Sequence, residues 1–231
     1  MKNPARLSMA LSGLGLCACT LLAGCGSHGH PSAAAMPVPE HELPMSMKVV
    51  GRSWRIVATD RDRERLRTWR EAWVEALAKI HTAGRDADIA DPLFEPDRAL
   101  DGGAPPPGRY HCHVFKLGAN GSAMKEFTSY PPEACLVADE GGITSLVKLE
   151  GPQRPIGLFF PESSSRQIFL GTMTYGDESK PMDYGRDDGR DLAGYVEKVG
   201  AQRWRLVFPY PKFESLVDVI ELVPDGAPVK P

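Results

Sequence analysis

Residues 192–208 read LAGYVEKVGAQRWRLVF, and the alternation in this stretch decides the predicted fold. In its second half, Trp204, Leu206 and Phe208 alternate with Arg203 and Arg205. In its first half, the same pattern separates two sets, Leu192, Gly194 and Val196 against Tyr195 and Glu197. Successive side chains of a β-strand point to opposite faces, so both halves predict strands, and Gly200-Ala201 between them predicts a hairpin turn.

The period of two recurs throughout the second half of the chain. Candidate strands are 109–117, 124–129, 134–139, 143–150, 155–160, 166–175, 192–199, 202–208 and 214–223. Asn120-Gly121 and Glu140-Gly141-Gly142 are further turn signals. Short strands joined by tight turns predict an antiparallel meander, and closure removes the exposed edge that invites aggregation. We expect a mainly β chain with a barrel-like meander of 8–9 strands, lipocalin-like or protease-inhibitor-like.

One long N-terminal helix is predicted before the strands. Apolar residues recur at helical spacing, at Leu66, Trp69, Trp73, Leu77 and Ile80, with Thr59 or Asp60 as the cap and an end near Gly84. We interpret the remaining positions of this helix as a solvent-exposed face on which charged side chains form ion pairs. These side chains are Arg61, Arg63, Arg65, Arg67 and Arg70 with Asp60, Asp62, Glu64 and Glu71. The proline-rich segment 84–108 then predicts a connector that wraps the fold.

The N-terminus has the pattern of a secretory signal. Lys2 and Arg6 precede an apolar run that is too short to span a bilayer, and the run ends in Leu22-Ala23-Gly24-Cys25. This ending is similar to the lipobox of bacterial lipoproteins, in which the cysteine is lipidated. Cleavage before Cys25 would leave 207 residues with 25 basic and 30 acidic side chains, a net charge of −5. Lipid chains would then supply the membrane affinity.

These features divide the chain into five parts. We predict a signal peptide at 1–24, a lipidated cysteine and flexible tether at 25–47, a helix and connector at 48–108, a barrel at 109–223 and a tail at 224–231. The whole chain has 27 Lys+Arg and 30 Asp+Glu among 231 residues. This near-neutral balance provides no strong positive field, so we expect no nucleic-acid partner.

Two cysteines lie in the predicted folded part, Cys112 and Cys135. In an oxidising envelope compartment they should form a disulfide, which would stabilise the fold by about 3 kcal/mol through the closed loop. The alternative is a cysteine nucleophile activated by His111 or His113. On a strand, however, both histidines point away from the face that carries Cys112, so the disulfide is favoured.

The last predicted strand contains acids on both of its apolar faces, Asp218 and Glu221. A buried carboxylate needs a partner, and Arg154, Arg190 or Arg205 could serve. The structural interpretation is a buried ion pair. The functional interpretation is a ligand-binding or general-acid carboxylate at a barrel mouth. If the protein is an enzyme, the weak catalytic candidates are Asp218, Glu221, His111 and Arg190.

No metal or cofactor is expected. His111 and His113 have a spacing that zinc sites use, yet a third ligand is not evident. Calcium binding is one possible role for the acidic residues of a single loop. These are Asp183, Asp187, Asp188 and Asp191. Their spacing differs from that of a calcium-binding loop, and turn caps paired with Arg186 and Arg190 are favoured.

Several short motifs carry a family resemblance, in chain order. They are Tyr110-His111-Cys112, Lys116-Leu117-Gly118, Tyr130-Pro131-Pro132, Gly151-Pro152-Gln153-Arg154-Pro155, Phe169-Leu170-Gly171-Thr172, Arg190-Asp191-Leu192-Ala193-Gly194 and Trp204-Arg205-Leu206-Val207. With them, residues 52–223 resemble a bacterial envelope family catalogued as domain of unknown function 4893. The resemblance implies no assigned activity and therefore no functional residues.

The sequence favours an envelope lipoprotein that acts as a non-enzymatic binding or interaction module. Its expected partners are the membrane, through the lipid anchor, and an unknown envelope protein or small ligand. We expect attachment to the periplasmic face of the outer membrane rather than to the inner membrane. The alternatives are a lipocalin-like carrier, which requires an open apolar cavity, and a periplasmic enzyme with a carboxylate/His site.

Overall fold

A computed structural model describes residues 42–43, 51–121 and 124–226 of the chain. The predicted signal peptide and Cys25 lie outside these residues, as does nearly all of the predicted tether. The described residues belong to one compact unit that begins at His41.

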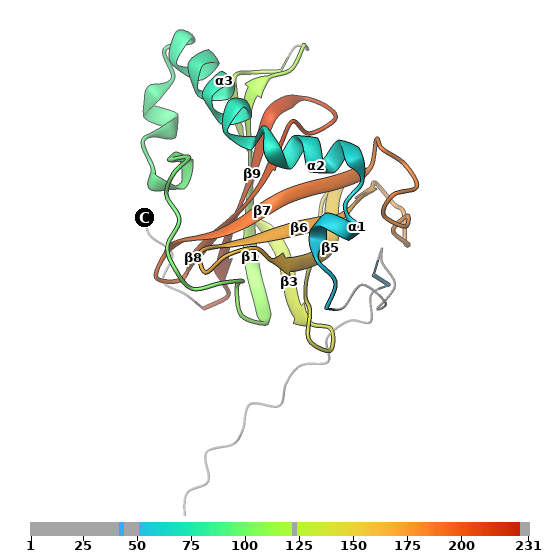
Figure 1. The fold of residues 1–231 in the computed structure, drawn as a ribbon. Coiled ribbons are helices and arrows are strands. Elements are labelled where there is room, and N and C mark those ends of the chain that lie inside the picture. Colours follow the sequence, from blue (N-terminus) through green and yellow to red (C-terminus); the bar gives the residue numbers. More distant parts are fainter. Residues whose placement is uncertain (1–41, 44–50, 122–123, 227–231) are drawn as a thin grey trace, which may run out of the picture. The chain divides into compact units, whose positions relative to one another are not determined.

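The core of this unit is a closed antiparallel β-barrel (Figure 1). Eight strands form it: β1 (Gly108–Ala119), β3 (Glu133–Asp139), β4 (Thr144–Lys148), β5 (Gln153–Pro161), β6 (Arg166–Tyr175), β7 (Asp191–Gly200), β8 (Arg203–Pro209) and β9 (Ser215–Pro224). Neighbours in sequence pair along the sheet, and β9 closes the barrel by pairing with β1. The predicted barrel is thereby confirmed.

The ninth strand, β2 (Phe127–Ser129), lies beside the second half of β1. The pairing of β1 with β3 ends at Cys112, and β2 takes up the same edge of β1 from Phe115 to Leu117. One long strand therefore pairs with two partners along a single edge, which explains why the described residues form nine strands but an eight-stranded barrel.

The barrel interior is filled by side chains from nearly every strand. The buried cluster consists of Tyr110, Cys112, Cys135, Val137, Leu146, Phe159, Phe169, Met173, Leu192, Val196, Trp204, Leu206, Phe208, Ile220 and Leu222. Inward-facing glycines make room for the large rings: a Cβ atom on Gly157 or Gly171 would lie 2.6 or 2.8 Å from Cζ of Phe169. Such distances are too short for a side chain, so the aromatic rings occupy the space above these glycines.

The connector contributes to closing the barrel at one end. Ala104 packs against the interior cluster, and the Tyr110 hydroxyl donates a hydrogen bond to the carbonyl of Pro106 (2.7 Å). Tyr110 also meets Trp204 edge to face, with 6.2 Å between the ring centroids. The proline-rich segment therefore follows the fold as predicted, and it packs onto the interior residues at the end where β1 begins.

The predicted single long helix is not confirmed, because two consecutive helices occupy its residues. These are α2 (Asp60–Arg67) and α3 (Trp69–Thr82), preceded by the one-turn α1 (Trp54–Val57). Thr68 separates them: its hydroxyl donates to the carbonyl of Glu64 (3.0 Å), a back-bond that bends helices. The predicted cap is confirmed, since the Thr59 hydroxyl accepts the N–H of Asp62.

The helices pack on the outside of the barrel (Figure 1). Trp73, Ala76 and Ile80 of α3 are fully buried in a second apolar cluster, together with outward-facing residues of β1, β7, β8 and β9. The Trp73 indole donates to the Tyr195 hydroxyl. Much of the outer face of the barrel is therefore also buried in a hydrophobic core. Because side chains alternate along these strands, one apolar cluster lies inside the barrel and the other lies between the barrel and the helices.

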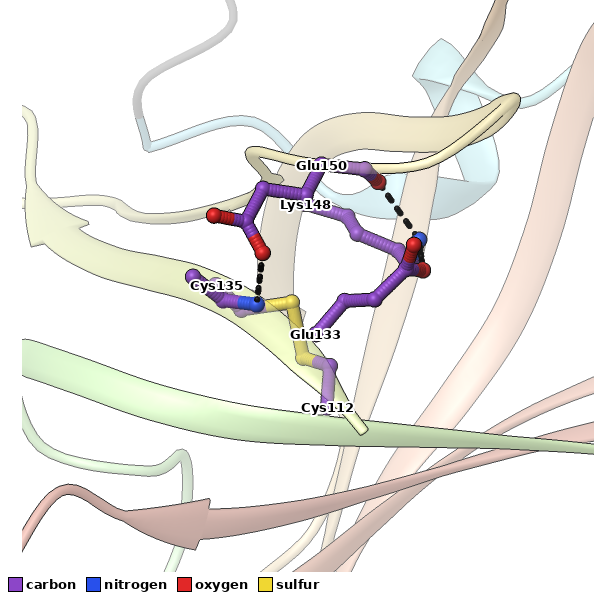
Figure 2. Close-up of a disulfide and its surroundings, with 6 residues drawn as sticks. Cys112, Glu133, Cys135, Lys148 and Glu150 are labelled. Carbon is purple, nitrogen blue, oxygen red and sulfur yellow. Dashed lines mark hydrogen bonds and ion pairs between the residues drawn. A yellow bond between two sulfur atoms is a disulfide. The ribbon is translucent and has the colours of Figure 1, made fainter. Parts of the chain in front are cut away.

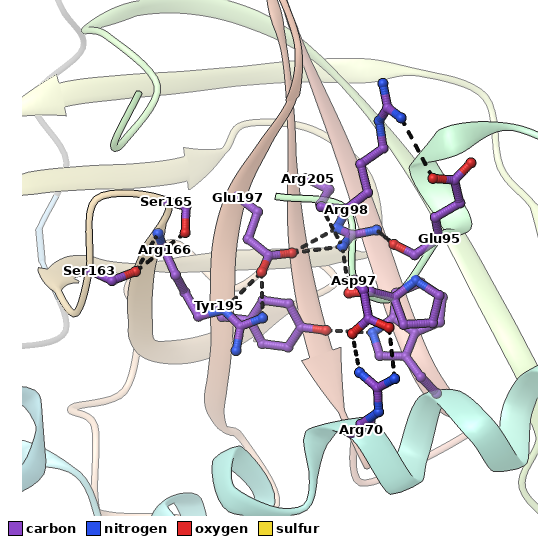
Figure 3. Close-up of polar contacts among 12 residues, drawn as sticks. Arg70, Glu95, Asp97, Arg98, Ser163, Ser165, Arg166, Tyr195, Glu197 and Arg205 are labelled. Carbon is purple, nitrogen blue, oxygen red and sulfur yellow. Dashed lines mark hydrogen bonds and ion pairs between the residues drawn. The ribbon is translucent and has the colours of Figure 1, made fainter. Parts of the chain in front are cut away.

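A buried ion pair joins the connector to this outer face (Figure 3). Arg205 and Glu197 have no exposed side-chain surface, and the Glu197 carboxylate accepts from Nε (3.0 Å) and Nη2 (2.7 Å) of Arg205. The other guanidinium contacts are backbone carbonyls of the connector, those of Leu93, Glu95, Pro96 and Arg98. Arg166 donates to the second oxygen of Glu197. The connector is thus held by donors that belong to the barrel.

Cys112 and Cys135 form the predicted disulfide (Figure 2). Their Cα atoms are 5.8 Å apart on the neighbouring strands β1 and β3, and both residues are fully buried inside the barrel. Lys148 and Glu133 form an ion pair close by, and the Lys148 ammonium also donates to the carbonyl of Glu150 (2.6 Å). His111 is exposed on the other face of β1, as the alternation predicts.

Candidate functional site

Charged residues gather at the barrel end where β1 finishes and β9 begins. We call Lys116, Gln153, Glu214, Ser215 and Asp218 the polar cluster. Lys116 and Asp218 are register partners on β1 and β9, and each shares the inward face of its strand with residues of the interior cluster. The alternation that points apolar side chains into the barrel therefore also points Lys116 and Asp218 into it, at one end.

The polar cluster is a connected network. The Lys116 ammonium lies 2.9 Å from Oδ2 of Asp218 and 2.9 Å from Oε2 of Glu214. The Ser215 hydroxyl donates to the other oxygen of Asp218, and the Gln153 amide donates to Glu214 (3.3 Å). Lys116 and Asp218 are buried, whereas about a third (34%) of the Glu214 side chain is exposed. Glu214 therefore links the buried ion pair to the surface.

Burial and charge act against each other on these groups. Burial raises the pKa of Asp218, although the Lys116 charge opposes part of this rise. Burial disfavours the charge of Lys116, yet Asp218 and Glu214 outweigh it and raise the Lys116 pKa. For Glu214, Lys116 outweighs burial and lowers the pKa. Lys116 thus keeps its charge and neutralises part of the acid charge at this barrel end.

The polar cluster supports the turn between β8 and β9. Tyr210 and Glu214 both have positive φ, 46° and 74°, a region that residues other than glycine rarely adopt. Hydrogen bonds hold the turn at both sides: Tyr210 N–H donates to Leu216, and Asn120 N–H donates to Glu214. Such strain persists only when the surroundings impose the conformation. Between these two residues, Phe213 is 58% exposed.

A second ion pair lies at the same end of the barrel. Arg190, just before β7, forms two hydrogen bonds with the Glu178 carboxylate, at 2.7 and 2.8 Å, and holds the Glu178 pKa at about 2. The Arg190 guanidinium also stacks on Tyr175 at the end of β6, 5.1 Å from the ring centroid. These contacts order the loop between β6 and β7.

The four weak catalytic candidates do not converge. Asp218 lies inside the barrel, whereas Glu221 lies on the outer face with Arg203 and near His113. His111 is exposed near Asp225 (3.3 Å), and Arg190 is bound to Glu178. Each of the four is therefore bound to a partner outside the set, and the structure does not bring them together in one site.

The predicted arginine partners of the buried acid are wrong. Arg154 donates to backbone carbonyls, Arg190 binds Glu178 and Arg205 binds Glu197. Lys116 fills this role instead. A signal for it was present in the sequence, since Lys116 has the same parity on its strand as Cys112, which is predicted to form the disulfide.

The acids of the β6–β7 loop are distributed among backbone donors and arginines. Oδ1 of Asp187 accepts the N–H of Gly189, and its carboxylate lies 3.6 Å from Arg190, as expected of a turn cap. Across residues 42–43, 51–121 and 124–226, no group of three His, Cys, Asp or Glu side chains is arranged to hold a metal.

The family model described as "Domain of unknown function (DUF4893)" matches residues 54–222, which include the helices, the connector and the barrel. Comparisons with curated proteins and with solved structures found no match. Among the helices that the structure describes, none is long and apolar enough to cross a membrane.

Proposed function

Because the chain belongs to the family described as a domain of unknown function (DUF4893), which carries no assigned activity, we propose its role from its own geometry. It is a lipid-anchored protein of the bacterial envelope, attached to the outer membrane at its periplasmic face. Its barrel is a non-enzymatic interaction module that presents the β8–β9 turn to an envelope protein.

The observation that carries this proposal is the exposure of Phe213 on a turn that the polar cluster and backbone hydrogen bonds hold in place. Exposed aromatic side chains on rigid supports lose little conformational entropy on binding and supply much of the energy of interfaces. The neighbouring Glu214 is partly exposed and adds a charge beside the ring. An apolar ring next to a fixed acid suits a protein partner with an apolar pocket and a basic rim.

The packing of the barrel favours this role over a small-ligand carrier. A lipocalin-like carrier needs an open apolar interior, whereas here aromatic rings stand over Gly157 and Gly171. The separation of Asp218, Glu221 and His111 likewise weakens the alternative of a carboxylate/His enzyme.

Photo-crosslinking in intact cells tests the interaction surface. A photoreactive residue in place of the exposed Lys212, beside Phe213, should form a discrete protein adduct. The adduct should disappear in Phe213→Ala and persist in Phe213→Tyr, because the aromatic ring makes the contact. The same residue at Ile56, which is 71% exposed on α1, is the matched control. Adducts that are indifferent to Phe213→Ala would contradict the proposed surface.

The anchor has its own test. Cys25→Ala removes the thiol that would carry the lipid, so the protein should move from the membrane fraction to the soluble periplasmic fraction. Cys17→Ala, in the predicted signal, is the matched control and should remain in the membrane fraction. Partitioning of Cys25→Ala that matches the native protein would refute the anchor and leave the crosslinking result unaffected.

A further inference from the structure

Two buried acids meet where α2 packs on the barrel. The charged run of α2 was predicted to be a solvated face, and this is wrong for Asp62 and Arg65, which are both buried. They form an ion pair, and Arg65 also donates to the backbone carbonyl of Asp191 (2.9 Å). A charged helix face is thus directed at the start of β7.

Asp191, the first residue of β7, brings the second carboxylate. Its residue is only 3% exposed, and its Oδ1 accepts the N–H of Gly185 (2.8 Å). In the part of the chain that the structure describes, its Oδ2 has no hydrogen-bond partner, nor has the buried Nε of Arg65. A buried carboxylate oxygen without a donor is unfavourable when the group is ionised.

The other groups around these acids do not neutralise both. Tyr184 donates to Asp62 and accepts the N–H of Thr59; burial and the Asp62 charge raise its pKa, so it stays neutral. Asp188 adds negative charge nearby and lies 3.7 Å from Arg61. On the strand side, Asp191 faces its uncharged register partner, Thr172 of β6. Arg65 therefore pairs with Asp62 and acts on the Asp191 carboxylate only through its charge.

The same contacts tie a long loop to the helix. Residues 176–190 connect β6 to β7, and Tyr184 and Gly185 of this loop bind Asp62 and Asp191. The Tyr184 hydroxyl and the Gly185 amide therefore both depend on these two acids. A change in the charge of that pair would act directly on the contacts that hold the loop against α2.

We propose that Asp62 and Asp191 form a pH-sensitive latch between α2 and the loop 176–190, closed when Asp191 holds a proton and loosened when Asp191 is ionised. This latch does not rest on the proposed interaction function. Protonation adds a donor at Oδ2 of Asp191 and removes a buried negative charge next to Asp62.

The direction of the response follows from the environment of Asp191. Burial, aided by the charges of Asp62 and Asp188, raises its pKa to about 6, while the Gly185 N–H and Arg65 oppose the rise. A carboxyl group with a raised pKa in the closed state stabilises that state at low pH. The stabilisation is complete below the ordinary aspartate pKa of about 4 and is lost as the pH rises through about 6.

Hydrogen exchange of the native protein between pH 5 and pH 7.5 tests the latch. The amide of Gly185, corrected for its intrinsic exchange rate, should lose about tenfold in protection over this interval, since each pKa unit corresponds to a factor of ten. Asp191→Asn should keep the protection constant with pH, because the amide is neutral throughout. Asp177→Asn, which replaces an exposed acid of the same loop, is the control and should retain the response.

Two results would overturn the latch: constant protection in the native protein, or an equal pH response in Asp191→Asn. Carbon-detected carboxyl titration of the native protein gives a second measurement that needs no variant. We expect the Asp191 carboxyl group to titrate near pH 6. Titration of Asp191 below pH 5 would refute the effect of its burial.

Discussion

Replacing Arg205 with methionine should lower the free energy of unfolding by about 3–5 kcal/mol, the range for removing one partner of a buried ion pair. The physical reason is the number of acceptors that Arg205 serves. It binds the Glu197 carboxylate and four connector carbonyls, with no exposed side-chain surface of its own. Methionine resembles the aliphatic part of the arginine side chain but supplies no hydrogen-bond donor. Urea unfolding followed by tryptophan fluorescence measures the loss.

Three further variants locate the effect. Arg205→Lys keeps the charge but has fewer donors and no planar fork, so it should recover only part of the loss. Arg67→Met removes an exposed arginine paired with Glu64 on α2 and should leave unfolding unchanged. In the double variant with Glu197→Gln, the loss should be smaller than the sum of the single losses. An Arg205→Met protein as stable as the native one would show that the connector is held by other contacts.

Replacing Lys116 with methionine should also lower the free energy of unfolding by about 3–5 kcal/mol at neutral pH. Asp218 is buried, and the variant leaves its carboxylate with the Ser215 hydroxyl but without the Lys116 charge. The turn that presents Phe213 should loosen too, because Lys116 also holds Glu214. Unfolding curves at several pH values measure the loss.

The pH dependence identifies the cause of the Lys116→Met effect. Burial already raises the pKa of Asp218, and losing Lys116 raises it further. Part of the lost stability should therefore return as the pH falls through the folded-state pKa of Asp218, where the carboxyl group becomes neutral. Adding Asp218→Asn should restore stability at neutral pH, and Lys212→Met on the same turn should have no effect. A loss that is independent of pH would point to packing instead of charge.

The arrangement of charge suggests how this fold combines stability with a presented surface. The interior is apolar and closed at one end by the connector, while the other end contains the polar cluster beneath the β8–β9 turn. Strain at Tyr210 and Glu214 is tolerated because buried contacts hold both sides of the turn. Variants of the polar cluster should therefore affect stability and binding together, whereas Phe213→Ala should affect binding alone.

The barrel and its disulfide could both be predicted from sequence patterns. Alternation along a strand has a fixed period, so Trp204, Leu206 and Phe208 had to share a face, and they lie inside as a set. The same alternation placed Cys112 and His111 on opposite faces of their strand, and the structure has Cys112 buried and His111 exposed. The predicted strand ranges agree with the observed ones within three residues at each end, because turn residues such as Asn120-Gly121 and Gly200-Ala201 delimit them.

The burial of particular charged residues, and the partners they bind, could not be predicted and follow from the tertiary packing. Asp62 and Arg65 have the sequence surroundings of a solvated helix face, and Arg205 those of an exposed strand face. Their burial depends on what lies above them, namely the start of β7 for α2 and the carbonyls of residues 93–98 for Arg205. Local periodicity specifies the direction of a side chain relative to its own element. Whether water or another segment meets it there depends on long-range packing, which local patterns do not encode.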